Sequence, residues 1–149
     1  SIRFLVTVRM IEEGLAFIIH AKPLFKAGTA ELLARKEELW WQIGGFAEDI
    51  LNEIRIVAIV DESSRVDSRK SSTTWGLGIE KAIAVKKKLE SCSDIAENRF
   101  SISCRQIGKE TGTSEAGALP RERIEIIVVG RRILEELSPE AIIVNDKWK

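Results

Sequence analysis

An acidic and a basic side chain flank one polar loop of this chain. Asp61 follows the apolar run "IRIVAIV" of residues 54–60, which predicts a buried strand, and Lys81 lies at the start of the helix expected after the loop. The end of a strand and the start of the next helix share one edge of a domain, so a ligand there meets both charges. A zwitterion suits them, with its ammonium on Asp61 and its carboxylate on Lys81. The alternative is an ordinary loop-capping aspartate and a solvated lysine.

Other residue patterns that support catalysis are sparse. The single histidine, His20, ends a predicted strand and is a weak candidate for a metal ligand or a base. The "GLG" of residues 76–78 lacks the spacing and the Lys-Ser/Thr of a phosphate-binding loop. Neither Cys92 nor Cys104 belongs to a signature with histidine. We therefore expect no catalytic residue, no metal site and no cofactor, and we predict that the protein is not an enzyme.

The two cysteines leave two alternatives open. In an oxidising compartment, one disulfide between Cys92 and Cys104 would close a short loop and contribute about 3 kcal/mol. Otherwise both residues are buried thiols.

Length and charge narrow the class of protein. The chain has 149 residues, which suits one domain with an appended tail, and its 23 Lys and Arg residues balance 23 Asp and Glu residues. Zero net charge argues against a nucleic-acid partner, because phosphate contacts need a basic excess. The sequence has no apolar run of about 18 residues that would span a membrane. The start "SIRFLVTVRM" lacks the features of a signal peptide, although a secreted origin stays open.

Hydrophobic periodicity predicts five strands and two main helices. Gly14, in the turn "IEEG", is expected to supply a positive φ to an N-terminal hairpin. The expected strands are residues 3–10, 15–20, 54–60, 99–104 and 123–129, the helices are 32–51 and about 77–89, and a short helix starts at 131.

Two adjacent pairs inside the first predicted helix limit how it can pack. Trp40 and Trp41 cannot both face the core, so one of them is expected to face solvent or a partner. Gly44 and Gly45 each cost helix propensity, about 1 kcal/mol, which a close approach by a neighbouring strand or a local kink would explain.

The order of these elements predicts an α+β fold. A strand–helix–strand–helix–strand core with mixed pairing gives a two-layer α/β sandwich, with a mixed β-sheet and the helices on one face. We expect one domain over residues 1–130, followed by a C-terminal helix and tail over 131–149.

Six fragments in this order resemble a known family. They are an "IEEG" turn, "PLFKAGTAEL", "IRIVAIVD", "TTWGLGIEKAIAV", "RFSIS" and "RERIEIIV", and they span about residues 4–129. Together they resemble the OmpA C-terminal-like peptidoglycan-binding domain, most closely the branch of MotB-type flagellar stator proteins. The resemblance implies a βαβαββ core preceded by a β-hairpin strand.

The resemblance also implies a ligand and the residues that bind it. Asp61 stands at the aspartate of the family's "GHTD", Lys81 at the arginine of its second helix and Arg123 at an arginine of its last strand, while Thr74, Leu77 and Gly78 lie at the helix start. These six residues are the peptidoglycan-binding positions that we expect, and the ligand is the zwitterionic diaminopimelate of the stem peptide. The implied protein is a non-catalytic periplasmic domain that anchors an envelope or motor protein to the cell wall, with a membrane anchor upstream.

The chain departs from the family pattern at several of these positions. "GHTD" is replaced by residues 58–61, "AIVD", and a forked arginine by the point charge of Lys81. A serine is replaced by Gly78, which predicts the loss of a helix N-cap. The sequence thus predicts a retained fold with a weakened or altered grip on peptidoglycan. The alternative is a degenerate domain that acts as a homodimerisation or protein-docking module, with the tail "AIIVNDKW" covering a partner.

Overall fold

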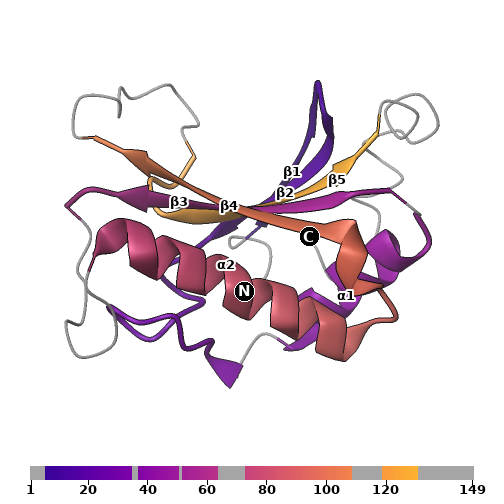
Figure 1. The fold of residues 1–149 in the computed structure, drawn as a ribbon, viewed down its shortest axis with the longest axis horizontal. Coiled ribbons are helices and arrows are strands. Elements are labelled where there is room, and N and C mark those ends of the chain that lie inside the picture. The colour runs from indigo at the N-terminus through magenta and orange to yellow at the C-terminus, as the bar shows by residue number, and fades with distance from the viewer. Residues whose placement is uncertain (1–5, 35–36, 51, 64–72, 109–118, 131–149) are drawn as a thin grey trace.

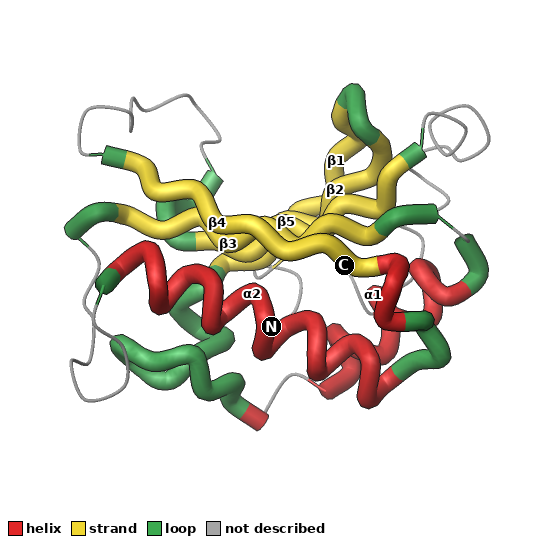
Figure 2. The backbone as a smooth tube through the Cα atoms, in the orientation of Figure 1, coloured by secondary structure: helices red, strands yellow, loops and turns green. Residues whose placement is uncertain are grey.

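The described residues form two layers, a β-sheet and two α-helices that lie on one of its faces (Figure 1). The structure is a computed structural model, and it describes residues 6–34, 37–50, 52–63, 73–108 and 119–130. Figure 2 shows that α1 and α2 lie on the same side of the strands. The elements are β1 (Val6–Ile11), β2 (Gly14–His20), α1 (Glu37–Glu48), β3 (Ile54–Asp61), α2 (Thr74–Cys92), the short 3-10 helix η3 (Glu97–Arg99), β4 (Phe100–Ile107) and β5 (Arg123–Val129).

The strands form one mixed sheet in the order β1-β2-β5-β3-β4. β3 and β4 run parallel, whereas β1 with β2, β2 with β5 and β5 with β3 pair antiparallel. This arrangement confirms the predicted α+β sandwich, and the order of elements is a βαβαββ core preceded by a hairpin strand. The predicted helix from residue 131 and the tail lie outside the described residues.

The hairpin turn needs glycine at position 14 for two reasons. Gly14 has a φ of 152°, which L side chains rarely adopt. A Cβ atom there would also lie 2.1 Å from the carbonyl oxygen of Val128 in β5. The positive φ predicted for this turn is therefore confirmed, and the close approach of β5 adds a second constraint.

The main core lies between the sheet and the helices. Alternate residues of β2, β3 and β5 pack there against α1 and α2, because successive side chains of a strand point to opposite faces. Trp40 is 1% exposed and belongs to this core, whereas its neighbour Trp41 is 66% exposed, as the sequence predicts.

The helices begin at other residues than the periodicity predicts. α1 starts at Glu37 rather than Leu32, because Leu32 pairs with Phe25 in an isolated β-bridge within the preceding segment. α2 starts at Thr74, three residues before the predicted start, and the Thr73 hydroxyl caps it by accepting a hydrogen bond from the amide of Gly76. The predicted loss of an N-cap at position 78 is therefore wrong.

Gly44 and Gly45 have different surroundings. A Cβ atom on Gly44 would lie 2.9 Å from the Cβ of Ser93, whereas one on Gly45 would meet no atom within 4 Å. The predicted close approach is therefore found at Gly44 alone, and it comes from the end of α2 rather than from a strand.

The two cysteines are free thiols. Cys104 lies against Gly78 of α2, and Cys92 follows Gly78 by 14 residues of the same helix, a separation of about 21 Å along the axis. A disulfide needs Cα atoms within about 7 Å, so both residues are thiols, but they are half-buried rather than buried as predicted.

Among the described residues, no helix is both long and apolar enough to cross a bilayer.

Candidate functional site

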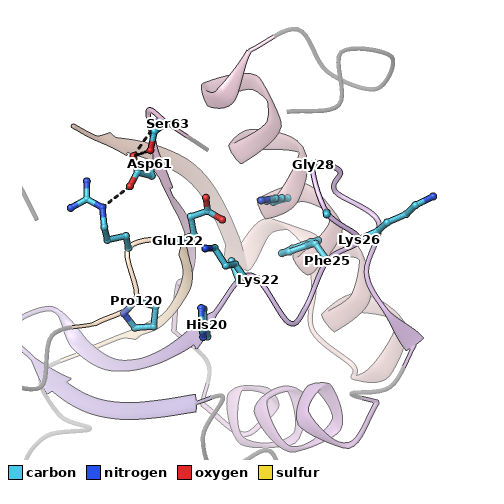
Figure 3. A pocket seen from close by; sticks show the side chains of 13 residues that line it. His20, Lys22, Phe25, Lys26, Gly28, Asp61, Ser63, Pro120 and Glu122 are labelled. Carbon is cyan, nitrogen blue, oxygen red and sulfur yellow. Dashed lines mark hydrogen bonds and ion pairs between the residues drawn. The ribbon is translucent and has the colours of Figure 1, made fainter. Parts of the chain in front are cut away.

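A pocket of about 700 Å³ opens where β3 ends, between the segment that follows β2 and the residues that lead into β5. The residues that line it come from β2, β3 and the turn after it, α2 and these two segments, so distant parts of the sequence meet there (Figure 3). The charged ones are Lys22, Lys26, Asp61, Lys81, Arg121 and Glu122.

Asp61 is held at the pocket wall by donors from two sides. Its Oδ2 accepts a hydrogen bond from Nε of Arg121 at 2.5 Å, and its Oδ1 accepts from the amide and the hydroxyl of Ser63 at 3.0 and 2.8 Å. Figure 3 marks these bonds with dashed lines. The Arg121 hydrogen bond and then those from Ser63 lower the pKa of Asp61 from 3.8 to about 2. Asp61 is therefore ionised at neutral pH and fixed in orientation.

Arg121 connects three segments at this edge of the sheet. Besides Asp61, which ends β3, it contacts the backbone beyond β4, because its Nη2 donates to the carbonyl oxygen of Gly108 at 2.6 Å. The arginine itself lies just before β5. This cross-link holds the strand ends together where the pocket opens.

Lys81 lies on the α2 side of the pocket and is almost fully buried. Only 7% of the residue is exposed, and its Nζ lies 5.3 Å from the centre of the Phe25 ring. Burial lowers the pKa of Lys81, and the negative charge of Glu122 opposes that shift. Lys81 lies about two turns into α2, rather than on its first turn as predicted, because the helix starts earlier.

The structure thus brings Asp61 and Lys81 to one pocket, as the sequence predicts, but it does not pair them with each other. The ion pair of Asp61 is with Arg121. The pocket offers carboxylates and cations together, which can hold a ligand that carries charge of both signs.

The other four predicted residues do not line the described part of this pocket. Leu77 is buried under the sheet, and a Cβ atom on Gly78 would lie 2.4 Å from the Sγ of Cys104, so these two positions serve packing. Thr74 is the first residue of α2 and is half-buried. Arg123 donates to Glu125 at 2.8 Å and to the carbonyl oxygen of Pro120 at 2.8 Å.

Sequence reasoning missed Arg121, Ser63 and Phe25. The only signal for Arg121 was the cluster "RER" at 121–123, and periodicity does not tell which arginine meets Asp61. Phe25 lies in an irregular segment, whose path depends on the local β-bridge to Leu32 and on the packing of Phe25 in the main core. Within the described ranges, no group of three or more His, Cys, Asp or Glu side chains is placed to hold a metal ion.

Comparison with known proteins identifies the fold. No protein-family model and no curated protein matches the sequence. Among solved structures, the T6SS cell wall anchor from Pseudomonas aeruginosa matches with a TM-score of 0.70 and 21% identity, over 85% of this chain and 89% of that one. The periplasmic domain of Helicobacter pylori MotB, residues 78–256, matches with a TM-score of 0.67 and 14% identity, over 88% and 86%.

A third solved structure is an OmpA-like domain, which is the fold that the sequence resembles. The OmpA-like domain of FopA1 from Francisella tularensis matches with a TM-score of 0.50 and 15% identity, over 81% of this chain and 77% of that one. The chain therefore has an OmpA-like fold, which it shares with MotB periplasmic domains, and the resemblance predicted from the sequence is confirmed at the level of the fold.

Proposed function

We propose that this protein is a non-catalytic periplasmic domain that binds peptidoglycan and anchors an envelope or motor protein to the cell wall. The observation that carries the proposal is the pocket in which Asp61 and Lys81 come together. Two of the solved structures with this fold are a cell wall anchor and a MotB periplasmic domain, which supports the same role here.

The ligand we propose is the diaminopimelate of the stem peptide, which carries an ammonium and a carboxylate group. Lys81 supplies a cation for the carboxylate, and Asp61 supplies negative charge on the opposite wall. The remaining predicted residues act indirectly in this proposal. Leu77 and Gly78 let α2 pack closely on the sheet. Arg123 holds the segment before β5 through its hydrogen bond to the carbonyl oxygen of Pro120.

Sedimentation with purified sacculi tests this function. The native protein is expected to pellet with sacculi at low salt, and more weakly as salt screens the charges of the pocket. Asp61→Ala is expected to abolish pelleting, because Asp61 supplies charge and also holds Arg121 at the pocket wall.

Glu53→Ala is the matched control. Glu53 also accepts hydrogen bonds from an arginine, Arg55, and a serine, Ser101, but it lies beside the other end of β3. The Glu53→Ala variant should pellet like the native protein. Native protein that stays in the supernatant at low salt would refute the proposed function.

The second candidate function is homodimerisation or protein docking. Its support in the structure is the exposed Trp41 of α1 and the half-exposed Trp75 of α2, because exposed indoles are common anchors of interfaces. The tail that suggested a partner from the sequence lies outside the described residues. Light scattering tests this candidate, and a monomer that pellets with sacculi would count against it.

A further inference from the structure

The face of the sheet opposite α1 and α2, here called the outer face, carries an apolar patch. Its centre is Ala16 and Ile18 of β2 and Ile127 of β5, and four partly buried residues pack against them: Ile11, Val57, Leu119 and Val129. Ile18 is only 4% exposed and Ile127 only 7%. Both described α-helices lie on the other side of the strands (Figure 2), so neither of them covers the patch. Its burial therefore requires a cover other than these helices.

The middle strands have the sequences of strands that are covered on both faces. β2 contains "LAFII", residues 15–19, and β5 contains "IIVV", residues 126–129, so both lack the alternation of a strand with one face in water. The edge strands do alternate, and they place polar residues such as Thr7 of β1 and Ser103 of β4 on the outer face. The cover is therefore needed over the middle of the sheet and not over its edges.

Of the segments outside the described residues, the tail 131–149 has the composition to supply this cover. Residues 64–72, "SRVDSRKSS", and 109–118, "KETGTSEAGA", are mostly polar, and residues 1–5 lead into the edge strand β1. By contrast, the tail "RRILEELSPEAIIVNDKWK" has apolar residues at helical spacing in its first half and the apolar run "AIIV" in its second.

The tail starts beside the patch. It follows Gly130, whose φ of 145° lets the chain turn out of the strand direction, and the amide of Gly130 donates to the carbonyl oxygen of Glu13 at 2.8 Å. Ile18 lies opposite Glu125, four residues before Val129, so the patch extends only about 13 Å back along β5. A helix over residues 131–137 is about 10 Å long, and the rest of the tail extends the reach beyond the whole patch.

Charges around the patch complement those of the tail. Arg9 of β1 and Arg55 of β3 lie in the same cross-strand row as the centre of the patch, one on each side of it, and Arg9 is exposed. In a helix over residues 131–137 the apolar residues share one face, which Glu135 and Glu136 flank. An apolar face with acidic flanks thus matches an apolar patch with basic flanks.

We propose that the outer face of the sheet is the docking site of the tail of the same chain, residues 131–149, whose apolar side chains cover Ala16, Ile18 and Ile127. The sheet is then the middle layer between the helices and the tail. A face closed in this way is not available to a partner protein. The inference goes beyond the proposed function, because the pocket lies where β5 begins and the tail starts where β5 ends.

Isoleucine methyl NMR of the full chain tests the docking directly. Nuclear Overhauser cross-peaks arise only between methyl groups that are close in space. We expect cross-peaks to Ile18 or Ile127 from at least one isoleucine of the tail, Ile133, Ile142 or Ile143.

The matched controls are Ile19 and Ile126. Each is the sequence neighbour of a patch residue, but it belongs to the main core and is 0% exposed on the face that the helices cover. Successive side chains of a strand point to opposite faces, so we expect no cross-peak between these two residues and the tail.

Two variants of the tail assign the contact to its apolar face. Ile133→Asp combined with Leu137→Asp is expected to remove the cross-peaks of the tail and to shift the methyl resonances of Ile18 and Ile127, because charged side chains do not pack on an apolar patch. Ser138→Asp adds a charge to a polar position of the same segment, and it should leave the cross-peaks in place. Unchanged resonances of Ile126 report that the main core stays folded.

The remaining outcomes would overturn the inference. Cross-peaks to the patch that come from Ile2, or the absence of any from the tail, would show that the tail is not the cover. A mixture of two differently labelled chains separates the copies, and cross-peaks that arise only between chains would assign the patch to the tail of a second copy. Sedimentation with sacculi is a separate measurement, so its failure would refute the anchoring function and leave the docking of the tail intact.

Discussion

The carboxylate of Asp61, at the end of β3, is held in its ionised form by its hydrogen-bond donors. Three donors from Arg121 and Ser63 surround its carboxylate, and they stabilise the ionised form over the protonated one. Its pKa falls from 3.8 to about 2, so the folded state binds a proton less readily than the unfolded chain does. The ionised carboxylate in turn keeps the guanidinium of Arg121 beside the strand ends.

This shift gives a prediction for the pH dependence of stability. Because the folded-state pKa is lowered, the contribution of Asp61 is present above about pH 4 and is lost as the pH falls through about 2. Asp61→Asn is therefore expected to be less stable than the native protein by about 1–2 kcal/mol at pH 7, allowing for solvent at the pocket rim. Urea unfolding measures the difference, which should shrink toward zero at pH 2. A difference that stays constant between pH 7 and pH 2 would contradict this account.

At the scale of elements, α1 offers a comparison between two adjacent glycines. Gly45→Ala is expected to stabilise the protein by about 0.5–1 kcal/mol, because alanine favours the helix and no atom lies within 4 Å of the added Cβ. Gly44→Ala is expected to destabilise it by up to about 2 kcal/mol, because the added Cβ would lie 2.9 Å from Ser93. Thermal unfolding measures both, and equal effects of the two substitutions would show that the end of α2 does not pack against α1 in this way.

The contact of α2 with β3 and β4 depends on the absence of a side chain at Gly78. An alanine Cβ there would lie 2.4 Å from the Sγ of Cys104 and 2.9 Å from a methyl group of Val60, so Gly78→Ala is expected to cost about 1–3 kcal/mol. The cost should fall by about 1 kcal/mol in a Cys104→Ala background, where the sulfur is gone but Val60 remains. Chemical denaturation of the two single variants and the double variant measures this coupling, and strict additivity would argue against the contact.

The elements differ in how well the sequence predicts them. The strands were predicted to within about three residues, because their apolar runs are short and bounded by polar or turn residues. The start of α1 was misplaced, because the apolar residues before Glu37 belong to an irregular segment that periodicity alone does not separate from a helix. The start of α2 was also misplaced, since its cap, Thr73, stands among several serines and threonines that are equally able to cap.

At the scale of the whole molecule, topology brings the pocket together from distant segments. Asp61 and Arg121 are 60 residues apart in the sequence, and they meet because β3 and β5 are neighbours in the sheet. The sequence predicted Asp61 and Lys81, since each belongs to a recognisable strand or helix. It could not predict Arg121 or Phe25, because the residues before β5 and after β2 show no periodicity of their own.

The central claim is that this pocket, through Lys81, attaches the domain to peptidoglycan. Sedimentation with sacculi of the native protein beside Lys81→Gln and Lys87→Gln tests it most directly. We predict that the native protein and Lys87→Gln pellet alike, because Lys87 is an exposed residue of α2 that does not line the pocket, and that Lys81→Gln stays in the supernatant. Circular dichroism should show that both variants are folded. If folded Lys81→Gln pelleted as well as the native protein, the pocket would not be the site of attachment.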